Sequence, residues 1–269
     1  MRFRSPAITE AAPRAAPVYD RIGIGYQRAR RADPRIASAI SAAIGDASRV
    51  VNVGAGTGNY EPTGRDLLVA VEPARAMLRQ RAADAAPAVQ AVAESLPFPD
   101  ATFDVALAVL TVHHWRDLAT GLAEMRRVAD RQVLYVFDTA MTNSFWLVTD
   151  YFPEILELYS ERAAPSIAQL AEHLDVRRVE PVPVPSDCTD GFGGCYWNRP
   201  EAYLDPVVRA GMSSFAQLDR EIEALGVERL RAALDSGAWD ARHGDMRTQT
   251  EHDLGYRLVI AGRPETTGE

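Results

Sequence analysis

Five nearly continuous apolar runs alternate with amphipathic segments in the first half of the chain. The runs cover 49–53, 67–71, 88–92, 103–110 and 132–137. A run that is apolar at every position predicts a strand buried on both faces, as in a parallel sheet covered by helices. The amphipathic segments predict helices over 18–44 (interrupted near residue 34), 74–81 and 118–129. This pattern indicates an α/β fold with a doubly wound, mostly parallel sheet and helices on both faces.

The rhythm changes after residue 138. Helices are expected at 145–159 and 167–173, whereas prolines restrict the alternating segment 176–184 to an edge strand, and 255–261 predicts a last strand. The long helical stretch between these two strands predicts an insertion that caps the sheet. We therefore divide the chain into an extended arm at 1–17, a sheet domain formed by 18–186 and 254–265, and a mostly helical C-terminal cap insertion at 187–253.

Composition and charge exclude several classes of partner. The chain has 269 residues and a formal net charge of −8, so it lacks the general electrostatic footprint of a protein that binds nucleic acid or anionic membranes. No run of 18 apolar residues is present, and the N-terminus lacks the apolar stretch of a secretory signal. We therefore expect a cytoplasmic protein with no nucleic-acid or membrane partner and with reduced thiols at Cys188 and Cys195.

A glycine-rich loop follows the first predicted strand. Gly54, Gly56 and Gly58 occupy alternate positions, and glycine permits both a sharp turn and the close approach of a ligand to the backbone. The dinucleotide fingerprint G-x-G-x-x-G would require a glycine where Asn59 stands. The loop therefore favours a cofactor without a pyrophosphate over NAD(P).

Glu72 ends the second predicted strand. An acidic side chain at this place can accept hydrogen bonds from both hydroxyl groups of a ribose. Enzymes that bind NAD share this feature, so Glu72 predicts a nucleoside-containing cofactor without choosing among such cofactors.

The segment LPFPDATFD at 96–104, taken with VGAGTG and Glu72, resembles the class I S-adenosylmethionine-dependent methyltransferases. It is most similar to the methyltransferase domain shared with ubiquinone and menaquinone biosynthesis enzymes, over about 18–138. The resemblance implies a Rossmann-like fold, S-adenosylmethionine as cofactor, S-adenosylhomocysteine as product and a small-molecule substrate. The cofactor site that it implies consists of Tyr26, Arg31, Asn52, Gly54, Gly56, Gly58, Glu72, Pro73, Ala93, Glu94, Leu110 and Thr111.

The resemblance also implies a role for each part of this site. The glycines face the methionine part of the cofactor, Glu72 holds the ribose, and Ala93 and Glu94 flank the adenine. Leu110 and Thr111 border the reactive sulfur. An N-terminal helix lies over the cofactor, and one of its arginines, Arg30 or Arg31, could pair with the cofactor carboxylate.

Two positions depart from the family pattern. Asn52 stands where the family usually has an acid, so it can form a hydrogen bond but offers no charge to the ammonium group of the cofactor. Val92 stands where aspartate is frequent and cannot accept a hydrogen bond from the adenine amine, which leaves that role to Glu94.

Two adjacent histidines, His113 and His114, follow the fourth predicted strand. Ligands of open α/β sheets bind beyond the carboxyl ends of the strands, and a histidine there can remove a proton because its pKa lies near neutrality. A contact with the cofactor or a purely structural role is the alternative. Their spacing is not a zinc signature, and no metal site is predicted.

The loop 187–197 is rich in glycine, aromatic and polar residues, a composition typical of small-molecule pockets as well as of packed irregular loops. Substrate-binding residues are expected in this loop, after the fifth strand and beside the histidines: Trp115, Phe145, Trp146, Asp190 and Tyr196.

The sequence thus predicts methyl transfer from S-adenosylmethionine to oxygen, nitrogen or carbon of a small metabolite, with His113 or His114 as the candidate base. Two alternatives remain open: a non-methylating reaction that uses the cofactor, and a cofactor-binding protein without catalysis. The sequence is compatible with a monomer or a homodimer. The fourth strand ends in LTVHH instead of the N/D-P-P-Y/F tetrapeptide of amino-methylating DNA enzymes, which argues against DNA as the substrate.

Overall fold

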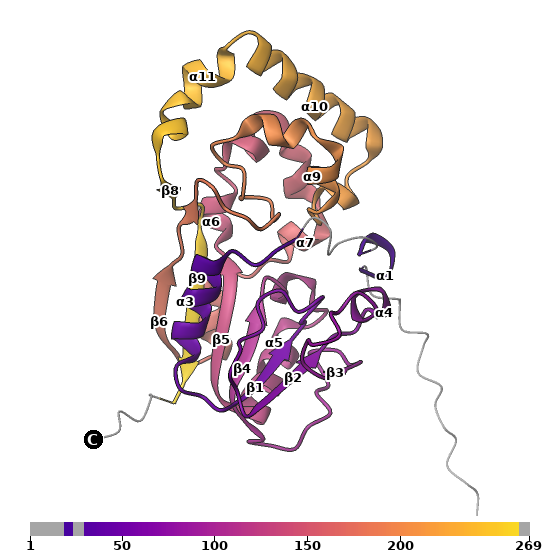
Figure 1. The fold of residues 1–269 in the computed structure, drawn as a ribbon, viewed down its shortest axis with the longest axis vertical. Coiled ribbons are helices and arrows are strands. Elements are labelled where there is room, and N and C mark those ends of the chain that lie inside the picture. Colours follow the sequence, from indigo (N-terminus) through magenta and orange to yellow (C-terminus); the bar gives the residue numbers. More distant parts are fainter. Residues whose placement is uncertain (1–18, 24–29, 264–269) are drawn as a thin grey trace, which may run out of the picture.

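The computed structural model describes residues 19–23 and 30–263 and is built on a seven-stranded sheet in the order β3-β2-β1-β4-β5-β9-β6 (Figure 1). The strands are β1 (Arg49–Val53), β2 (Leu67–Val71), β3 (Ala88–Val89), β4 (Phe103–Val109), β5 (Ala129–Phe137), β6 (Val176–Pro181), β7 (Val184–Pro185), β8 (Glu251–His252) and β9 (Tyr256–Gly262). The α-helices are α1 (Tyr19–Ile22), α3 (Pro34–Ile44), α4 (Arg75–Leu78), α5 (Leu118–Val128), α6 (Thr139–Thr142), α7 (Tyr159–Arg162), α8 (Ile167–His173), α9 (Pro206–Ala210), α10 (Arg220–Asp235) and α11 (Ala238–His243).

The strands β1 to β5 pair in parallel, and β9 runs antiparallel between β5 and β6. This arrangement confirms the predicted Rossmann-like, mostly parallel sheet, the last strand near 255–261 and the edge position of the proline-containing segment. Pro181 is tolerated at the end of β6 because an edge strand needs hydrogen bonds on one side alone.

Apolar residues at consecutive positions of a strand serve two different cores. In β4, Val105 and Leu107 pack in the cluster that contains the buried isoleucines of α3, whereas Ala106 and Ala108 pack in the cluster that contains Leu122 of α5. Each fully buried Leu or Val side chain contributes roughly 1.5–3 kcal/mol to stability. The apolar runs of the sequence are therefore uninterrupted because both faces of the sheet are covered, as predicted.

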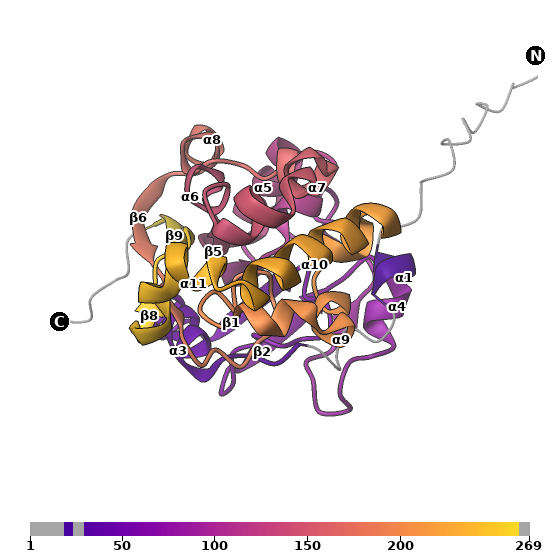
Figure 2. The ribbon, with the colours of Figure 1, turned by 90° about the horizontal axis from the view of Figure 1, so that it is seen from above.

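The cap lies over the carboxyl ends of the parallel strands, with α10 running across the top of the sheet (Figures 1 and 2). Its core contains Phe152, Tyr203 and Trp239, all with no exposed surface. Residues that directly follow β5 thus share the core of the cap, and β7 pairs with β8 where the insertion leaves and rejoins the sheet domain. The division of the chain at residue 187 stays a prediction.

Three predicted elements are wrong in extent. The segment 145–159 is not one helix: a π-helical turn at Leu147–Tyr151 (η2) is followed by a 3-10 helix at Pro153–Glu157 (η3), and α7 comes after it. Pro153 explains the break, since proline lacks an amide donor and its ring clashes with the preceding turn. The predicted helix at 74–81 shortens to α4, and the predicted strand at 88–92 shortens to the two-residue edge strand β3.

Candidate functional site

The glycine loop follows β1 and lies directly against the end of β4. The amides of Gly54 and Ala55 both donate to the carbonyl oxygen of Val71, over 2.8 and 3.0 Å, which ties the loop to β2. Gly54 has a φ of +72°, and a Cβ added to it would stand 2.1 Å from Thr111 Oγ1. A side chain is therefore excluded at this position both by backbone conformation and by contact.

Glu72 is a buried carboxylate at the end of β2. Its Oε2 accepts a hydrogen bond of 2.9 Å from the amide of Gly56, and its Oε1 accepts one of 2.8 Å from the amide of Ala74. Burial raises the pKa of Glu72, and the two amide donors oppose that rise. Each carboxylate oxygen can accept more than one hydrogen bond, so Glu72 keeps capacity for a pair of hydroxyl groups.

A cavity opens above these residues at the carboxyl end of the sheet. Most of the predicted cofactor residues line it, namely Asn52, Gly54, Gly56, Glu72, Pro73, Ala93, Glu94, Leu110 and Thr111. Tyr19, Arg30 and Met77 line it as well, although sequence reasoning gave no role to Tyr19 or Met77. Among the remaining predictions, Gly58 and the exposed Arg31 lie outside this lining, and Tyr26 lies outside the described residues.

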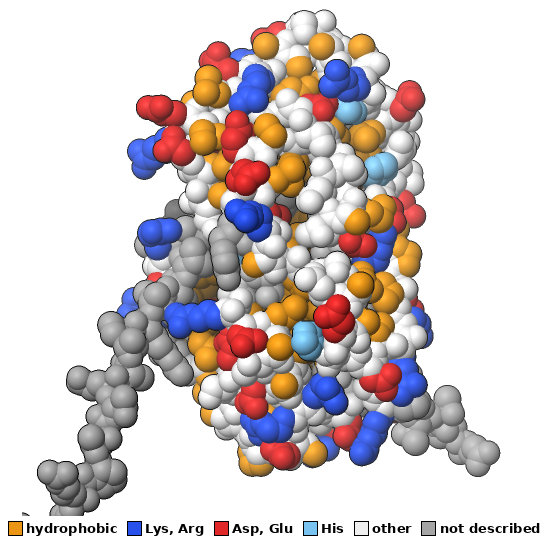
Figure 3. All heavy atoms as spheres, turned by 180° about the vertical axis from the view of Figure 1, so that it is seen from behind, with side chains coloured by type: hydrophobic (Ala, Val, Ile, Leu, Met, Phe, Trp, Pro, Cys, Tyr) orange, Lys and Arg blue, Asp and Glu red, His pale blue; other side chains and the backbone are white. Residues whose placement is uncertain are grey.

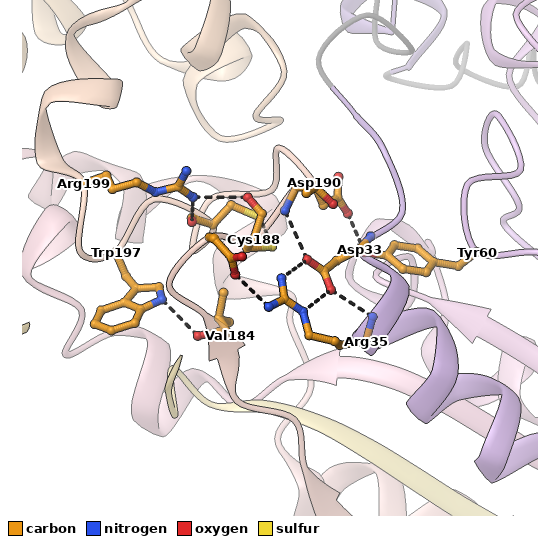
Figure 4. Close-up of polar contacts among 11 residues, drawn as sticks. Asp33, Arg35, Tyr60, Val184, Cys188, Asp190, Trp197 and Arg199 are labelled. Carbon is orange, nitrogen blue, oxygen red and sulfur yellow. Dashed lines mark hydrogen bonds and ion pairs between the residues drawn. The ribbon is translucent and has the colours of Figure 1, made fainter. Parts of the chain in front are cut away.

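A buried ion pair with Asp190 holds Arg30, the arginine that lines the first cavity. Arg30 Nε and Nη2 donate to the two carboxylate oxygens of Asp190, over 2.5 and 3.1 Å, and the hydroxyl of Tyr60 donates to Asp190 Oδ2 over 2.8 Å. The same loop is held by Asp33, whose carboxylate accepts from the amide of Thr189 (Figure 4). Asp190 therefore acts on the cavity through Arg30, and it lines neither this cavity nor the one described below.

The comparisons with known proteins agree with this geometry. The methyltransferase-domain family matches residues 51–137. A structure named as a methyltransferase from an antibiotic biosynthesis pathway of Anabaena variabilis is 33% identical, covers 87% of this chain and 99% of its own, and superposes with a TM-score of 0.79. The chain belongs to the class I S-adenosylmethionine-dependent methyltransferases. S-adenosylmethionine is accordingly its cofactor, and methyl transfer is its activity.

Two solved structures of lower sequence identity share the fold. A Thermotoga maritima S-adenosylmethionine-dependent methyltransferase is 14% identical, with coverages of 90% of this chain and 91% of its own and a TM-score of 0.50. A Bacillus halodurans structure named as a methyltransferase is 13% identical, with coverages of 85% and 98% and a TM-score of 0.52. The uncharacterised Escherichia coli protein YafE is 44% identical over 39 residues, which make up 14% of this chain and 19% of that protein.

The side chain of Asn52 indicates whether the first cavity of this methyltransferase can accept the amino group of the cofactor. Its side chain is buried and lines the cavity, and its Oδ1 has no hydrogen-bond partner among the described residues. A buried acceptor without a partner costs about 1–3 kcal/mol, which an ammonium donor would remove. The asparagine that replaces the usual acid therefore still offers what the amino group of the cofactor requires.

The two histidines lie on a 3-10 turn, η1 (Val112–His114), directly after β4. His114 Nε2 and the hydroxyl of Tyr19 form a hydrogen bond of 3.1 Å, and the two imidazole rings lie 3.9 Å apart. Burial lowers the pKa of His114 to about 4 and that of His113 well below its usual value. Both rings are thus neutral at pH 7 and weak as bases, which favours positioning over proton removal.

A second cavity adjoins the first, and the two share Tyr19, Arg30 and Leu110 in their lining. Its walls are predominantly apolar and come from both the sheet domain and the cap: Phe137, Phe145, Leu147, Val148, Ile155, Leu156, Phe192, Met212, Phe215, Leu254 and Tyr256. Leu110, at the boundary, has a φ of +48°, a strained conformation for a side-chain-bearing residue. The end of β4 is therefore held in a special backbone geometry where the cavities meet.

Glu161 of α7 supplies the one carboxylate among the described residues that line the second cavity. Burial raises its pKa to about 7. Sequence reasoning missed it, because a glutamate in a helical segment carries no local signal and its burial is created by the cap.

The structure separates the predicted substrate-binding residues. Phe145 lines the second cavity, whereas Trp115 lines the first. Trp146 is buried in the core of the cap, where its Nε1 donates to the carbonyl oxygen of Trp197 over 2.8 Å. Tyr196 packs beneath the guanidinium of Arg199 and lines neither of these two cavities.

The described residues hold no candidate metal-binding group and no candidate membrane-spanning helix. No group of three or more His, Cys, Asp or Glu side chains there could hold a metal ion. Within 19–23 and 30–263, no helix has the length and apolar character needed to cross a membrane. On the face shown in Figure 3, acidic and basic side chains are interspersed.

Proposed function

We propose that this methyltransferase modifies oxygen, nitrogen or carbon of a small molecule that binds in the second cavity, with the methyl donor in the first. The observation that carries the proposal is the pair of adjoining cavities that share Tyr19, Arg30 and Leu110. Apolar walls with a few polar groups are typical of small-molecule sites, and the cap supplies part of the walls of this one.

The residues of the first cavity have distinct roles in this proposal. Glu72 holds the ribose hydroxyl groups, Asn52 accepts from the amino group, and Arg30 pairs with the carboxylate of the methionine part. The cofactor supplies a sulfonium whose methyl group is already activated for displacement. The protein therefore contributes mainly proximity and orientation, which can amount to about 7–11 kcal/mol of the barrier.

Product mass distinguishes methyl transfer from a non-methylating reaction. We expect the protein, incubated with S-adenosylmethionine labelled in its methyl group and a panel of apolar small molecules, to yield a product that carries one labelled methyl. A product of unchanged mass would contradict the proposal, and so would labelled macromolecules in place of labelled small molecules.

Glu72→Gln should weaken cofactor binding by about 10–100-fold, since a hydrogen bond to a charged group contributes about 1.5–3 kcal/mol and 1.4 kcal/mol corresponds to a factor of ten. Calorimetric titration with S-adenosylhomocysteine measures this change. Glu228→Gln, at an exposed glutamate of α10, is the matched control and should bind as the wild type does. Equal affinities of the wild type, Glu72→Gln and Glu228→Gln would show that Glu72 does not bind the cofactor.

A further inference from the structure

Glu161 has an environment that is unusual for a carboxylate. It lines the predominantly apolar second cavity, and no hydrogen bond or ion pair joins its side chain to a described residue. Its helix, α7, packs against η1, which carries the two histidines. A carboxyl group without a partner in such surroundings lowers the stability of the folded protein, because burial disfavours its charged form. A ligand bound in the cavity would supply the missing partner.

Four other charged or titratable side chains among the described residues line the same cavity: Tyr19, Arg30, His113 and Tyr256. Burial keeps His113 neutral and raises the pKa of Tyr256 well above its usual value. The guanidinium of Arg30 stays charged and is paired with Asp190. Glu161 is thus the group in this set whose pKa, about 7, allows it to change charge near neutrality.

The lining also restricts the acceptor. Phe137, Phe145, Phe192 and Phe215 provide aromatic walls suited to a ring system. A second cation would be disfavoured beside Arg30, whereas a hydroxyl that becomes negative would be stabilised by it. A phenol has a pKa near that of tyrosine, about 10, so a carboxylate of raised basicity can take its proton as the reaction proceeds.

We propose that the second cavity binds an apolar aromatic acceptor through a phenolic hydroxyl group, and that Glu161 is the base that removes its proton. This inference rests on the proposed function. As the acceptor oxygen forms its bond to the methyl carbon, the bond from that carbon to the sulfonium sulfur breaks, and the sulfur keeps the electron pair as a neutral thioether. The hydroxyl proton passes to the Glu161 carboxylate and then to solvent.

The first test needs no turnover. The infrared spectrum of the wild type should contain a protonated-carboxyl band that disappears as the pH rises through about 7, and Glu161→Gln should lack this band. Glu157→Gln, an exposed glutamate four residues earlier, is the control and should retain it. Glu161→Gln should fold normally, because the substitution removes no hydrogen bond or ion pair to a described residue, and thermal unfolding checks this point. Absence of the titrating band in the wild type would overturn the role of Glu161 as a base.

The second test uses 2-naphthol and naphthalene as matched probes, with S-adenosylhomocysteine present for binding and S-adenosylmethionine for turnover. The wild type should bind 2-naphthol at least about tenfold more tightly than naphthalene, as one additional hydrogen bond to a charged group predicts. Its kcat/KM for 2-naphthol should rise with pH through about 7 and then level off. Glu161→Gln should lose about 10²–10⁴-fold in kcat and lack this rise, whereas Glu157→Gln should match the wild type.

The outcomes separate this inference from the proposed function. A wild type that binds the donor but does not discriminate between the two probes overturns the phenolic acceptor. Full turnover by Glu161→Gln overturns the base. Failure to bind S-adenosylmethionine overturns the proposed function instead, because naphthol binding and the infrared titration would still report on Glu161.

Discussion

Asp190→Ala should lower the free energy of unfolding by about 3–5 kcal/mol, which is the usual cost of breaking a buried ion pair by removing one partner. The Asp190 side chain is completely buried and contacts both the Arg30 guanidinium and the Tyr60 hydroxyl. Burial and the Asp190 charge raise the pKa of Tyr60, so its hydroxyl remains a donor and would lose its acceptor. Urea denaturation measures the loss. Weaker binding of S-adenosylhomocysteine should accompany it, since Arg30 loses the carboxylate that orients it.

Asp187→Ala provides a control from the same loop. Asp187 also pairs with an arginine, Arg35, over 2.7 Å, but its side chain is 79% exposed. An ion pair of a fully exposed side chain contributes little to stability, because water and salt screen it, so this variant should unfold almost as the wild type does. Equal destabilisation by the two substitutions would mean that the buried Asp190–Arg30 pair stabilises the fold no more than the exposed Asp187–Arg35 pair does.

Gly54→Ala should reduce affinity for S-adenosylmethionine by at least about 100-fold and also destabilise the fold. The left-handed backbone at φ +72° costs a side-chain-bearing residue roughly 1–2 kcal/mol, and the overlap with Thr111 adds about 1–3 kcal/mol. To relieve the overlap, the loop must move away from the end of β4, which displaces the wall of the cofactor cavity. Calorimetric titration and thermal unfolding measure the two effects.

Gly64→Ala separates backbone strain from contact. Gly64 has nearly the same φ, +70°, but a Cβ added there would meet nothing within 4 Å. This variant should lose about 1–2 kcal/mol of stability and retain its affinity for the cofactor. If Gly64→Ala weakened binding as much as Gly54→Ala, the loss would reflect general destabilisation and not the contact with Thr111.

The sequence predicts the sheet well where burial acts on every residue. In β1 and β4, a strand covered on both faces leaves an uninterrupted apolar run, and no other element needs to be known. The segment 145–159 was mispredicted because its apolar periodicity persists across Pro153, while the choice between a helix and successive short turns depends on packing within the cap.

The residues of the site likewise fall into those that local sequence predicts and those that depend on distant parts of the chain. The places of Gly54 and Glu72 in the lining of the first cavity were predictable, because they depend on local backbone geometry at the end of a strand. Arg30 and its neighbour Arg31 are alike in sequence, and the choice between them depends on Asp190, which is 160 residues away. Glu161 gave no signal at all, because its unusual surroundings are assembled by residues from β5, β9 and the cap.

The position of β9 has a consequence for synthesis of the protein. This strand is near the end of the described chain, yet it lies between β5 and β6, both of which are translated earlier. While the ribosome is still producing the cap, β5 and β6 each present an unsatisfied row of backbone donors and acceptors toward the vacant position. The nascent chain can complete its sheet only after β9 has emerged from the exit tunnel, which makes the interval before that moment the one in which the protein most needs protection from aggregation.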